Sequence, residues 1–267
     1  MKEQDSIPTS KTERSAKFVK TGLKVGGNYI KHYSKKLFNP SLNKDELNLD
    51  NATDIYASLS ELKGSALKVA QMLSMDQNIL PKAYVDQFSL SQYNAPPLSG
   101  PLIVRTFSKY FGKTPSEIYD EFNIRSTNAA SIGQVHQASL NGKKLAVKIQ
   151  YPGVGDSISS DLKMVKPFAF RLLGMSQKEL EVYMCEVEER LLEETDYELE
   201  IKRSIEFSEA CKNIANVVFP TYYPELSSKR IITMDWLDGL HMKEFMKTNP
   251  SQELRDKVGQ ALWDFYN

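Results

Sequence analysis

The dipeptide Asn141-Gly142 separates two stretches in which apolar and polar residues alternate, 132–140 and 143–150. A two-residue type I′ turn needs positive φ at both of its central positions, and Asn-Gly is a pair that adopts these angles readily. The pattern therefore predicts an antiparallel β-hairpin in the middle of the chain. The remaining segments have to be arranged around this hairpin.

Helical periodicity dominates the residues on both sides of the hairpin. Before it, the sequence predicts helices over 15–37, 50–75, 82–93, 101–111 and 114–122. After it, the sequence predicts helices over 160–173, 176–214, 241–247 and 251–267, and a second strand pair over 217–219 and 229–236. Helices followed by a hairpin, a long helix and another strand pair form an α+β plan.

The charge of the chain is balanced overall but not locally. It carries 34 basic and 34 acidic residues, so it lacks the chain-wide basic footprint of a general nucleic-acid binder, and we expect no nucleic-acid partner. Residues 1–40, however, contain nine Lys or Arg and three Asp or Glu, a net charge of +6. Residues 1–14 are polar and are predicted to be a disordered tail.

The basic helix predicted over 15–37 has an apolar side that consists of Phe18, Val25, Tyr29 and Tyr33. One interpretation places this side in the interface of an anionic membrane, with the lysines near the headgroups. The other packs it on the rest of the domain. Because the chain has no run of 18 apolar residues and no signal-peptide pattern, we expect a cytoplasmic or peripherally membrane-bound protein.

Three segments carry chemical signals. Small residues over 128–135 let backbone N–H groups approach a phosphate, and Lys148 stands between Val147 and Ile149, as kinases place the lysine that holds the α- and β-phosphates. The acidic run 193–200 can supply the glutamate that pairs with such a lysine. Each signal has an ordinary structural reading, as a tight turn, a solvated strand lysine or a solvated helix face. The two cysteines and three scattered histidines predict no metal site.

The order of these segments resembles the N-lobe of a protein kinase, with residues 234–239 at the hinge that offers backbone groups to adenine. The amino-acid sequences of these segments are similar to motifs of the ABC1/UbiB family of atypical kinases, which includes the AarF and ADCK proteins. The matching motifs are the K-x-G-Q-like segment 67–74, the alanine-rich segment 129–136, the lysine strand and turn 146–154, and the E-x-D segment 194–197. The resemblance covers roughly residues 51–267.

The resemblance implies a set of site residues. The implied catalytic residues are Lys68, Gln71, Lys148, Glu194 and Glu200. The implied nucleotide-binding residues are Ala129, Ala130, Ser131, Ile132, Gly133, Gln134, Val135, Lys148, Asp196, Met234, Asp235, Trp236 and Leu237. The sequence departs from the family pattern at Ala70, which stands at a glycine position, and at Asn128, which stands at the first alanine of the loop.

The two acids of the E-x-D region cannot both serve one lysine on a continuous helix. Glu194 and Glu200 are six residues apart, so their directions differ by about 120° on an ideal helix. We therefore expect either Glu194 or Glu200 to pair with Lys148 and the other to meet Lys68. Family resemblance also implies that the helix bearing Lys68 and Gln71 lies across the nucleotide cleft, which favours ATP hydrolysis or small-molecule phosphotransfer over protein phosphorylation.

The resemblance also divides the chain. We expect a polar tail (1–14), a basic helix and linker (15–49), a helical extension (50–120), a kinase-like N-lobe up to the hinge (121–239) and the start of a truncated C-lobe (240–267). The catalytic-loop and DFG-type residues that would bind Mg²⁺ in a kinase fold are not found in this sequence.

Two functional hypotheses follow. The first is an ATP- or ADP-binding ABC1/UbiB-type atypical kinase or ATPase that is membrane-associated and serves isoprenoid-quinone metabolism, with a lipid or quinone precursor as a further ligand. The second is a catalytically incomplete, pseudokinase-like module that binds a nucleotide or docks on a membrane. Mg²⁺-dependent ATP turnover separates them, and for residues 1–267 we expect none.

Overall fold

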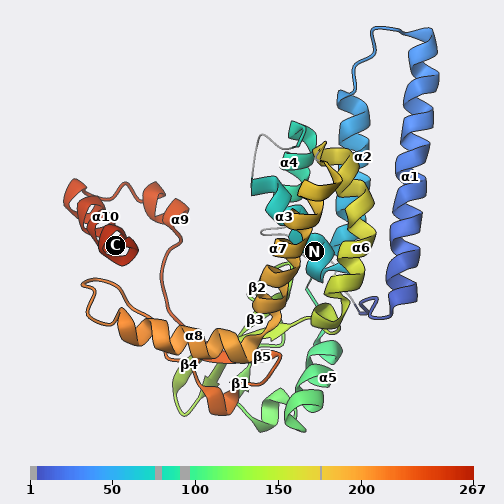
Figure 1. Ribbon diagram of the computed structural model, residues 1–267. Coiled ribbons are helices and arrows are strands. Elements are labelled where there is room, and N and C mark those ends of the chain that lie inside the picture. The colour runs from blue at the N-terminus through green and yellow to red at the C-terminus, as the bar shows by residue number, and fades with distance from the viewer. Residues whose placement is uncertain (1–4, 76–79, 91–96, 175) are drawn as a thin grey trace.

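The computed structural model describes residues 5–75, 80–90, 97–174 and 176–267. It confirms an α+β fold, in which an antiparallel sheet lies at one end of a layer of helices (Figure 1). The helices are α1 (Lys11–Phe38), α2 (Asp45–Leu62), α3 (Gly64–Met75), α4 (Lys82–Ser89), α5 (Gly100–Phe111), α6 (Val154–Leu173), α7 (Gln177–Thr195), α8 (Tyr197–Ala210), α9 (Met242–Lys247) and α10 (Gln252–Tyr266). The strands and 3₁₀ turns are β1 (Glu121–Phe122), β2 (Asn128–Ala129), β3 (Gly133–Leu140), β4 (Lys143–Gln150), β5 (Ile231–Asp235), η2 (Pro115–Glu117) and η3 (Pro224–Leu226).

The predicted hairpin is confirmed by β3 and β4. The two strands pair antiparallel from the turn, where Leu140 faces Lys143, along their whole length. Asn141 and Gly142 have φ angles of 51° and 75°, as a type I′ turn requires. The sheet has the strand order β1-β3-β4-β5, and β2 also pairs with β3.

Of the second predicted strand pair, one strand is confirmed and the other is wrong. Strand β5 lies within the predicted range 229–236, but residues 217–219 form no strand. Instead, β5 pairs antiparallel with β4, and Tyr222 forms an isolated bridge to Met234. Because β4 pairs with β3 on one side and with β5 on the other, its backbone is held along both edges.

The helix predicted over 114–122 is wrong as well. The segment consists of η2 followed by β1, whose Glu121 pairs with Ser139 of β3. The ring of Phe122 stacks on His136 with a centroid distance of 5.1 Å and meets Phe107 edge-on at 5.4 Å. Strand pairing and aromatic packing therefore override the local helical pattern.

The helix predicted over 50–75 is two helices, α2 and α3. The break lies at Lys63 and Gly64, whose φ angles are 53° and 65°. The N–H of Gly64 donates to the carbonyl oxygen of Ser131 at 2.7 Å, which ties the start of α3 to the loop before β3. A chain that continued straight through this joint would carry α3 away from the sheet.

The other predicted helices correspond to elements of the structure with shifted ends. The helix predicted over 82–93 is α4, which ends at Ser89, and residues 91–93 lie outside the described residues. The helix predicted over 160–173 is α6, which begins six residues earlier, at Val154. Among the described residues, no helix combines the length and the apolar character that crossing a membrane requires.

Helix α1 begins inside the segment predicted to be a disordered tail. It starts at Lys11, four residues before the predicted start, and the Ser10 side chain caps it by accepting a hydrogen bond from the N–H of Glu13. Arg14 is only 2% exposed. Helix α1 extends into this segment because Arg14 is held by a partner far along the chain.

That partner is Asp161 of α6. Its carboxylate accepts hydrogen bonds from Nε and Nη2 of Arg14 at 2.7 and 2.5 Å and from the hydroxyls of Ser65 and Ser157 at 2.5 and 3.1 Å. Arg14 also donates to the carbonyl oxygen of Leu62 at 2.8 Å. These groups, which we call the Arg14–Asp161 cluster, join α1, α3 and α6 and the end of α2.

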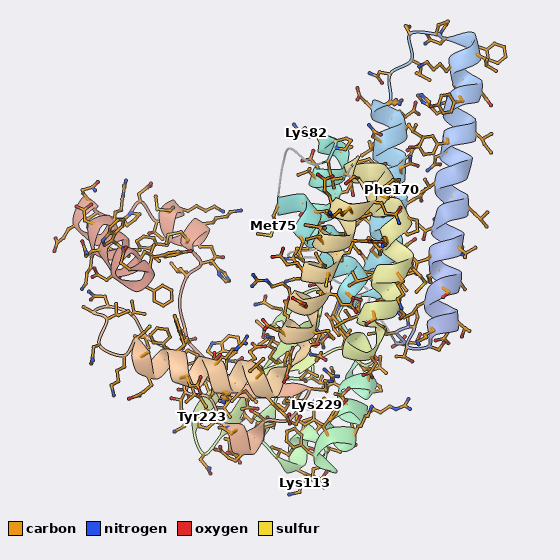
Figure 2. The ribbon with its side chains drawn as sticks, viewed as in Figure 1. Met75, Lys82, Lys113, Phe170, Tyr223 and Lys229 are labelled. Carbon is orange, nitrogen blue, oxygen red and sulfur yellow. The ribbon has the colours of Figure 1, made fainter. Side chains whose placement is uncertain are left out.

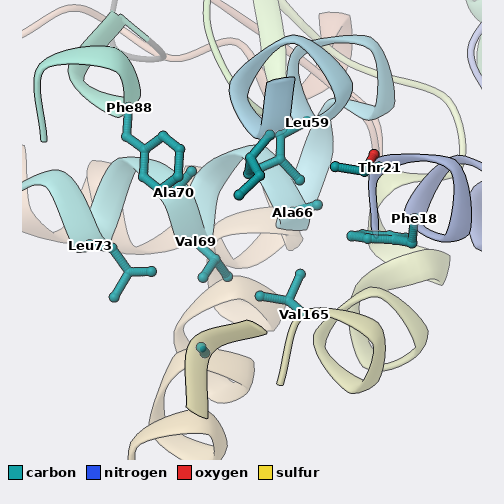
Figure 3. Close-up of a pocket in the computed structure, with 11 residues that line it drawn as sticks. Phe18, Thr21, Leu59, Ala66, Val69, Ala70, Leu73, Phe88 and Val165 are labelled. Carbon is teal, nitrogen blue, oxygen red and sulfur yellow. The ribbon is translucent and has the colours of Figure 1, made fainter. Parts of the chain in front are cut away.

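An apolar pocket lies behind α3, lined by side chains of α1, α2, α3, α4 and α6 (Figure 3). Helix α3 contributes Val69, Ala70 and Leu73 to this lining. Because these residues face the pocket, Lys68 and Gln71 are left on the polar side of the same helix. The polar side makes the contacts with α7 and with the loop before β3 that are described next.

Candidate functional site

Lys148 lies in the middle of β4. Val147 and Ile149 on either side of it are fully buried in the main core, so Lys148 points to the other face of the sheet. Its Nζ donates to both carboxylate oxygens of Glu200 at 2.7 and 2.9 Å. Val135, another predicted nucleotide contact, lies opposite Lys148 on β3.

The predicted helix over 176–214 is broken at Asp196 into α7 and α8. Asp196 caps α8, because its carboxylate accepts a hydrogen bond from the N–H of Leu199 at 3.0 Å. The carbonyl oxygen of Thr195, the last residue of α7, accepts hydrogen bonds from Gln150 at 3.0 Å and Arg230 at 2.8 Å. The break therefore has capping partners on both sides, and it places the two acids on different helices.

The break settles which acid meets which lysine. Glu200, on α8, pairs with Lys148, and Glu194, on α7, pairs with Lys68 of α3 at 2.8 Å. All four side chains are between 21% and 40% exposed, so both pairs are accessible to solvent. The sequence left the two assignments open because it gave no sign of a break between the acids.

The polar side of α3 lies against the alanine-rich loop. The hydroxyl of Ser131 donates to Oε1 of Gln71 at 3.3 Å, and the carbonyl oxygen of Ser131 accepts from Gly64. Ala130 is exposed and Ala129 is half-buried, whereas Ser131 and Ile132 are buried. The part of the loop that is open to a ligand is therefore its first half.

Gln134 is a predicted nucleotide contact that the structure places in the core. It is 1% exposed, and its Oε1 accepts a hydrogen bond from the N–H of Leu98 at 2.7 Å. Its amide nitrogen donates to Nε2 of His136 at 2.9 Å, while Nδ1 of His136 bonds the carbonyl oxygen of Asn123. Burial lowers the pKa of His136, which fits this neutral pairing. Gln134 therefore contributes to the packing around the site through its contacts with Leu98 and His136.

Gly133 stands where no side chain fits. A Cβ at this position would lie 2.5 Å from the carbonyl oxygen of Ile149 and 3.1 Å from the hydroxyl of Tyr197. The loop can therefore enter β3 close to β4 only with glycine at this position.

The predicted hinge residues lie at the end of β5 and just beyond it. Met234 and Asp235 pair with β4, and the carboxylate of Asp235 accepts a hydrogen bond from Tyr223 at 2.6 Å. The N–H groups of Asp235 and Trp236 donate to carbonyl oxygens at 2.9 and 3.1 Å. Leu237 is half exposed, and its N–H donates no hydrogen bond within the described part of the chain. Leu237 therefore offers a free backbone donor at the predicted hinge.

Sequence reasoning missed three residues that shape this site. Gln150 and Arg230 hold the end of α7, and the ring of Tyr197 lies under the ammonium group of Lys148 at 4.7 Å from centroid to Nζ. Gln150 and Tyr197 lie inside two of the recognised motifs, which was the available signal, whereas nothing near Arg230 indicates its role. Among the described residues, no three His, Cys, Asp or Glu side chains are gathered so that they could hold a metal ion.

Several known proteins are similar to this chain. Residues 90–267 match the ABC1 atypical kinase-like domain. The chain is 30% identical to the probable serine/threonine-protein kinase abkA of Dictyostelium discoideum, over 96% of this chain and 49% of that protein. It is 31% identical to the mitochondrial atypical kinase COQ8 of Schizosaccharomyces pombe, over 96% of this chain and 42% of that protein. The chain thus spans less than half the length of these two relatives.

A solved structure has a similar fold. The complex of Rv3197 with erythromycin, from Mycobacterium tuberculosis, is 30% identical and superposes with a TM-score of 0.51, covering 81% of this chain and 56% of that chain. The domain match extends over two thirds of the sequence, and the lysine strand, the E-x-D segment and the predicted hinge all lie within it. The chain belongs to the ABC1 atypical kinase-like family.

Proposed function

We propose that this chain binds ATP or ADP, with the phosphates at Lys148 and the open half of the alanine-rich loop and the adenine near Leu237. The observation that carries the proposal is the bidentate pair between Lys148 and Glu200. A carboxylate that binds the ammonium group of a half-buried lysine with both oxygens holds that group in one place, where it can meet phosphate oxygens. Ala129 and Ala130 present no bulky side chains that would keep a phosphate from the backbone.

Replacing Lys148 with alanine should weaken ATP and ADP binding about tenfold to a hundredfold, as expected for the loss of one charge-assisted hydrogen bond. Isothermal titration calorimetry on the full chain measures this. Lys144→Ala is the matched control, because Lys144 lies on the same strand but is 63% exposed and sits 3.6 Å from its partner Asp238. A wild-type chain that binds neither nucleotide would contradict the proposal, as would a Lys148→Ala variant that binds as tightly as the wild type.

For the whole protein we propose phosphotransfer to a small molecule or ATP hydrolysis. Support comes from α3, because Gln71 contacts Ser131 of the loop and Lys68 binds Glu194. If the nucleotide binds at this loop, α3 would occupy the side from which a peptide substrate would approach. The family resemblance, with COQ8 proteins among the relatives, supports a role in isoprenoid-quinone metabolism and a lipid or quinone precursor as ligand.

We also propose that α1 contacts an anionic membrane, through a different face from the one predicted. Phe18 is buried against the domain, whereas Val19, Leu23 and Ile30 are 63%, 74% and 72% exposed. These three residues form an exposed apolar stripe, because spacings of four and seven residues place them on one side of the helix. Leu37, which is 82% exposed, continues the stripe at the end of α1.

The charges around this stripe are only partly free. Lys24 and Lys35 are paired with Asp54 and Glu46 of α2, at 3.2 and 3.1 Å. Lys20 and Lys31 form no ion pair among the residues that the structure describes. We therefore attribute most of the membrane contact to the apolar stripe and a smaller part to electrostatic attraction.

The variant Leu23→Glu/Ile30→Glu should lose co-sedimentation with vesicles that contain phosphatidylglycerol, because each substitution places a carboxylate in the apolar stripe. Val218→Glu is the control, since Val218 is equally exposed, at 75%, but lies far from α1 in the sequence. Equal binding of the wild type and the double variant would remove α1 from the membrane contact. Equal binding to neutral phosphatidylcholine vesicles would show that the lysines contribute nothing.

A further inference from the structure

Tyr197 is the first residue of α8 and is fully buried. It forms a small apolar cluster with Ile201 and Ile232, the second of which lies directly opposite Lys148 in the pairing of β4 with β5. The Nζ of Lys148 lies 4.7 Å from the centroid of the Tyr197 ring. A lysine at this distance from an aromatic face is attracted by the negative electrostatic potential of the ring.

Tyr197 and Glu200 act on Lys148 together. They are three residues apart on α8, so they project from the same side of the helix. The carboxylate of Glu200 binds the ammonium group with two oxygens, and the ring of Tyr197 lies against it from another direction. A flexible lysine side chain held on two sides has fewer conformations to lose when a ligand binds.

The hydroxyl of Tyr197 has a different environment from the ring. It lies against Gly133, at the start of β3, where a Cβ would come within 3.1 Å of it. Among the described residues it has no hydrogen-bond partner. Burial raises the pKa of Tyr197, and the nearby Gln150 side chain opposes part of this rise. The contact with Lys148 is therefore made by the ring, and phenylalanine should preserve it.

We propose that Tyr197 is a positioning residue that holds the ammonium group of Lys148 where it meets the nucleotide phosphates. The inference rests on the proposed function, because it assumes that Lys148 contacts a nucleotide. It adds that the aromatic ring, together with Glu200, sets the orientation of Lys148 before the nucleotide arrives.

The experiment is NMR spectroscopy of the full chain with ¹³C-labelled lysine side chains, combined with nucleotide titrations. The ε-CH₂ signal of Lys148, assigned by its absence in Lys148→Arg, should lie upfield of the other lysines because of the ring current of Tyr197. Tyr197→Phe should keep this shift and the ATP affinity. Tyr197→Leu should lose the shift and bind ATP about two- to fivefold more weakly.

Tyr222→Leu is the matched control, because Tyr222 packs against the same small cluster, but among the described residues no lysine lies over its ring. It should leave the Lys148 signal in place even if it lowers stability. The shift in the wild type is informative even where Tyr197→Leu does not fold. A wild-type Lys148 signal without an upfield shift would overturn the inference, as would a Tyr197→Phe variant that behaves like Tyr197→Leu.

The two proposals fail in distinguishable ways. If the wild type shows the shifted signal, Tyr197→Leu removes it and no nucleotide binds, then Tyr197 positions Lys148 but the proposed function is wrong. If ATP binds and depends on Lys148 while the signal is unshifted, the proposed function stands and the role of Tyr197 is refuted.

Discussion

Replacing Asp161 with alanine should lower the free energy of unfolding by about 3–5 kcal/mol, as is typical when one partner of a buried ion pair is removed. The side chains of Arg14 and Asp161 are 2% and 0% exposed. The substitution would leave the guanidinium group of Arg14 buried without its carboxylate and would deprive Ser65 and Ser157 of their acceptor. Urea-induced unfolding of the wild type and the variant measures the difference.

Asp156→Ala is the control for Asp161→Ala. Asp156 lies on the same helix, but it is 86% exposed and 3.8 Å from Arg230, so its removal should change stability by less than about 1 kcal/mol. The double variant Arg14→Met/Asp161→Leu should recover much of the lost stability, because it leaves no unpaired buried charge. A loss of below about 1 kcal/mol in Asp161→Ala would mean that the Arg14–Asp161 cluster does not hold α1 on the domain.

Short sequence patterns predicted those parts of the fold that depend on residues close together in the sequence. The β3–β4 hairpin depends on the φ angles of Asn141 and Gly142, which the residue types themselves indicate. Arg14 gave no such signal, because its partner Asp161 is 147 residues away. The disordered tail was therefore predicted too long.

The two unpredicted helix breaks have the same kind of cause. The joint between α2 and α3 is held by the hydrogen bond from Gly64 to Ser131, and the end of α7 is held by Gln150 and Arg230. Both breaks depend on groups of the sheet and its loops that helical periodicity does not reveal. Apart from the segment 114–122, where it was wrong, periodicity identified the helices but not the points at which contacts with the sheet and its loops interrupt them.

For the site, family motifs in the sequence indicated the four charged residues, and the structure supplied their pairing. Lys148 meets Glu200 and Lys68 meets Glu194 because the break at Asp196 separates the acids. The part that each residue plays in nucleotide binding stays a prediction. Tyr197 shows a further limit, since a tyrosine next to an acidic motif looks the same in sequence whether it is exposed or lies under a lysine.

Raising the pH from 7 to 9 should stabilise the protein by about 2 kcal/mol through Lys63. Lys63 is fully buried at the joint between α2 and α3, and burial lowers its pKa from 10.5 to about 7. Between these two pKa values the unfolded chain binds more protons at this residue than the folded chain does. Stability therefore rises with pH across this range and falls as the pH drops towards 7.

Urea unfolding at pH 7, 8 and 9 tests this against Lys63→Met, which removes the titrating group but keeps an unbranched side chain of similar length. The free-energy difference between the wild type and Lys63→Met should shift by about 2 kcal/mol in favour of the wild type over this range. Lys113→Met, at an exposed lysine just beyond α5 (Figure 2), should keep the pH dependence of the wild type. The ring of Tyr151, 4.2 Å from Nζ of Lys63, favours the charged lysine, so the size of the rise measures how far this ring offsets burial. Identical pH dependence in the wild type and Lys63→Met would show that Lys63 is charged in the folded protein throughout.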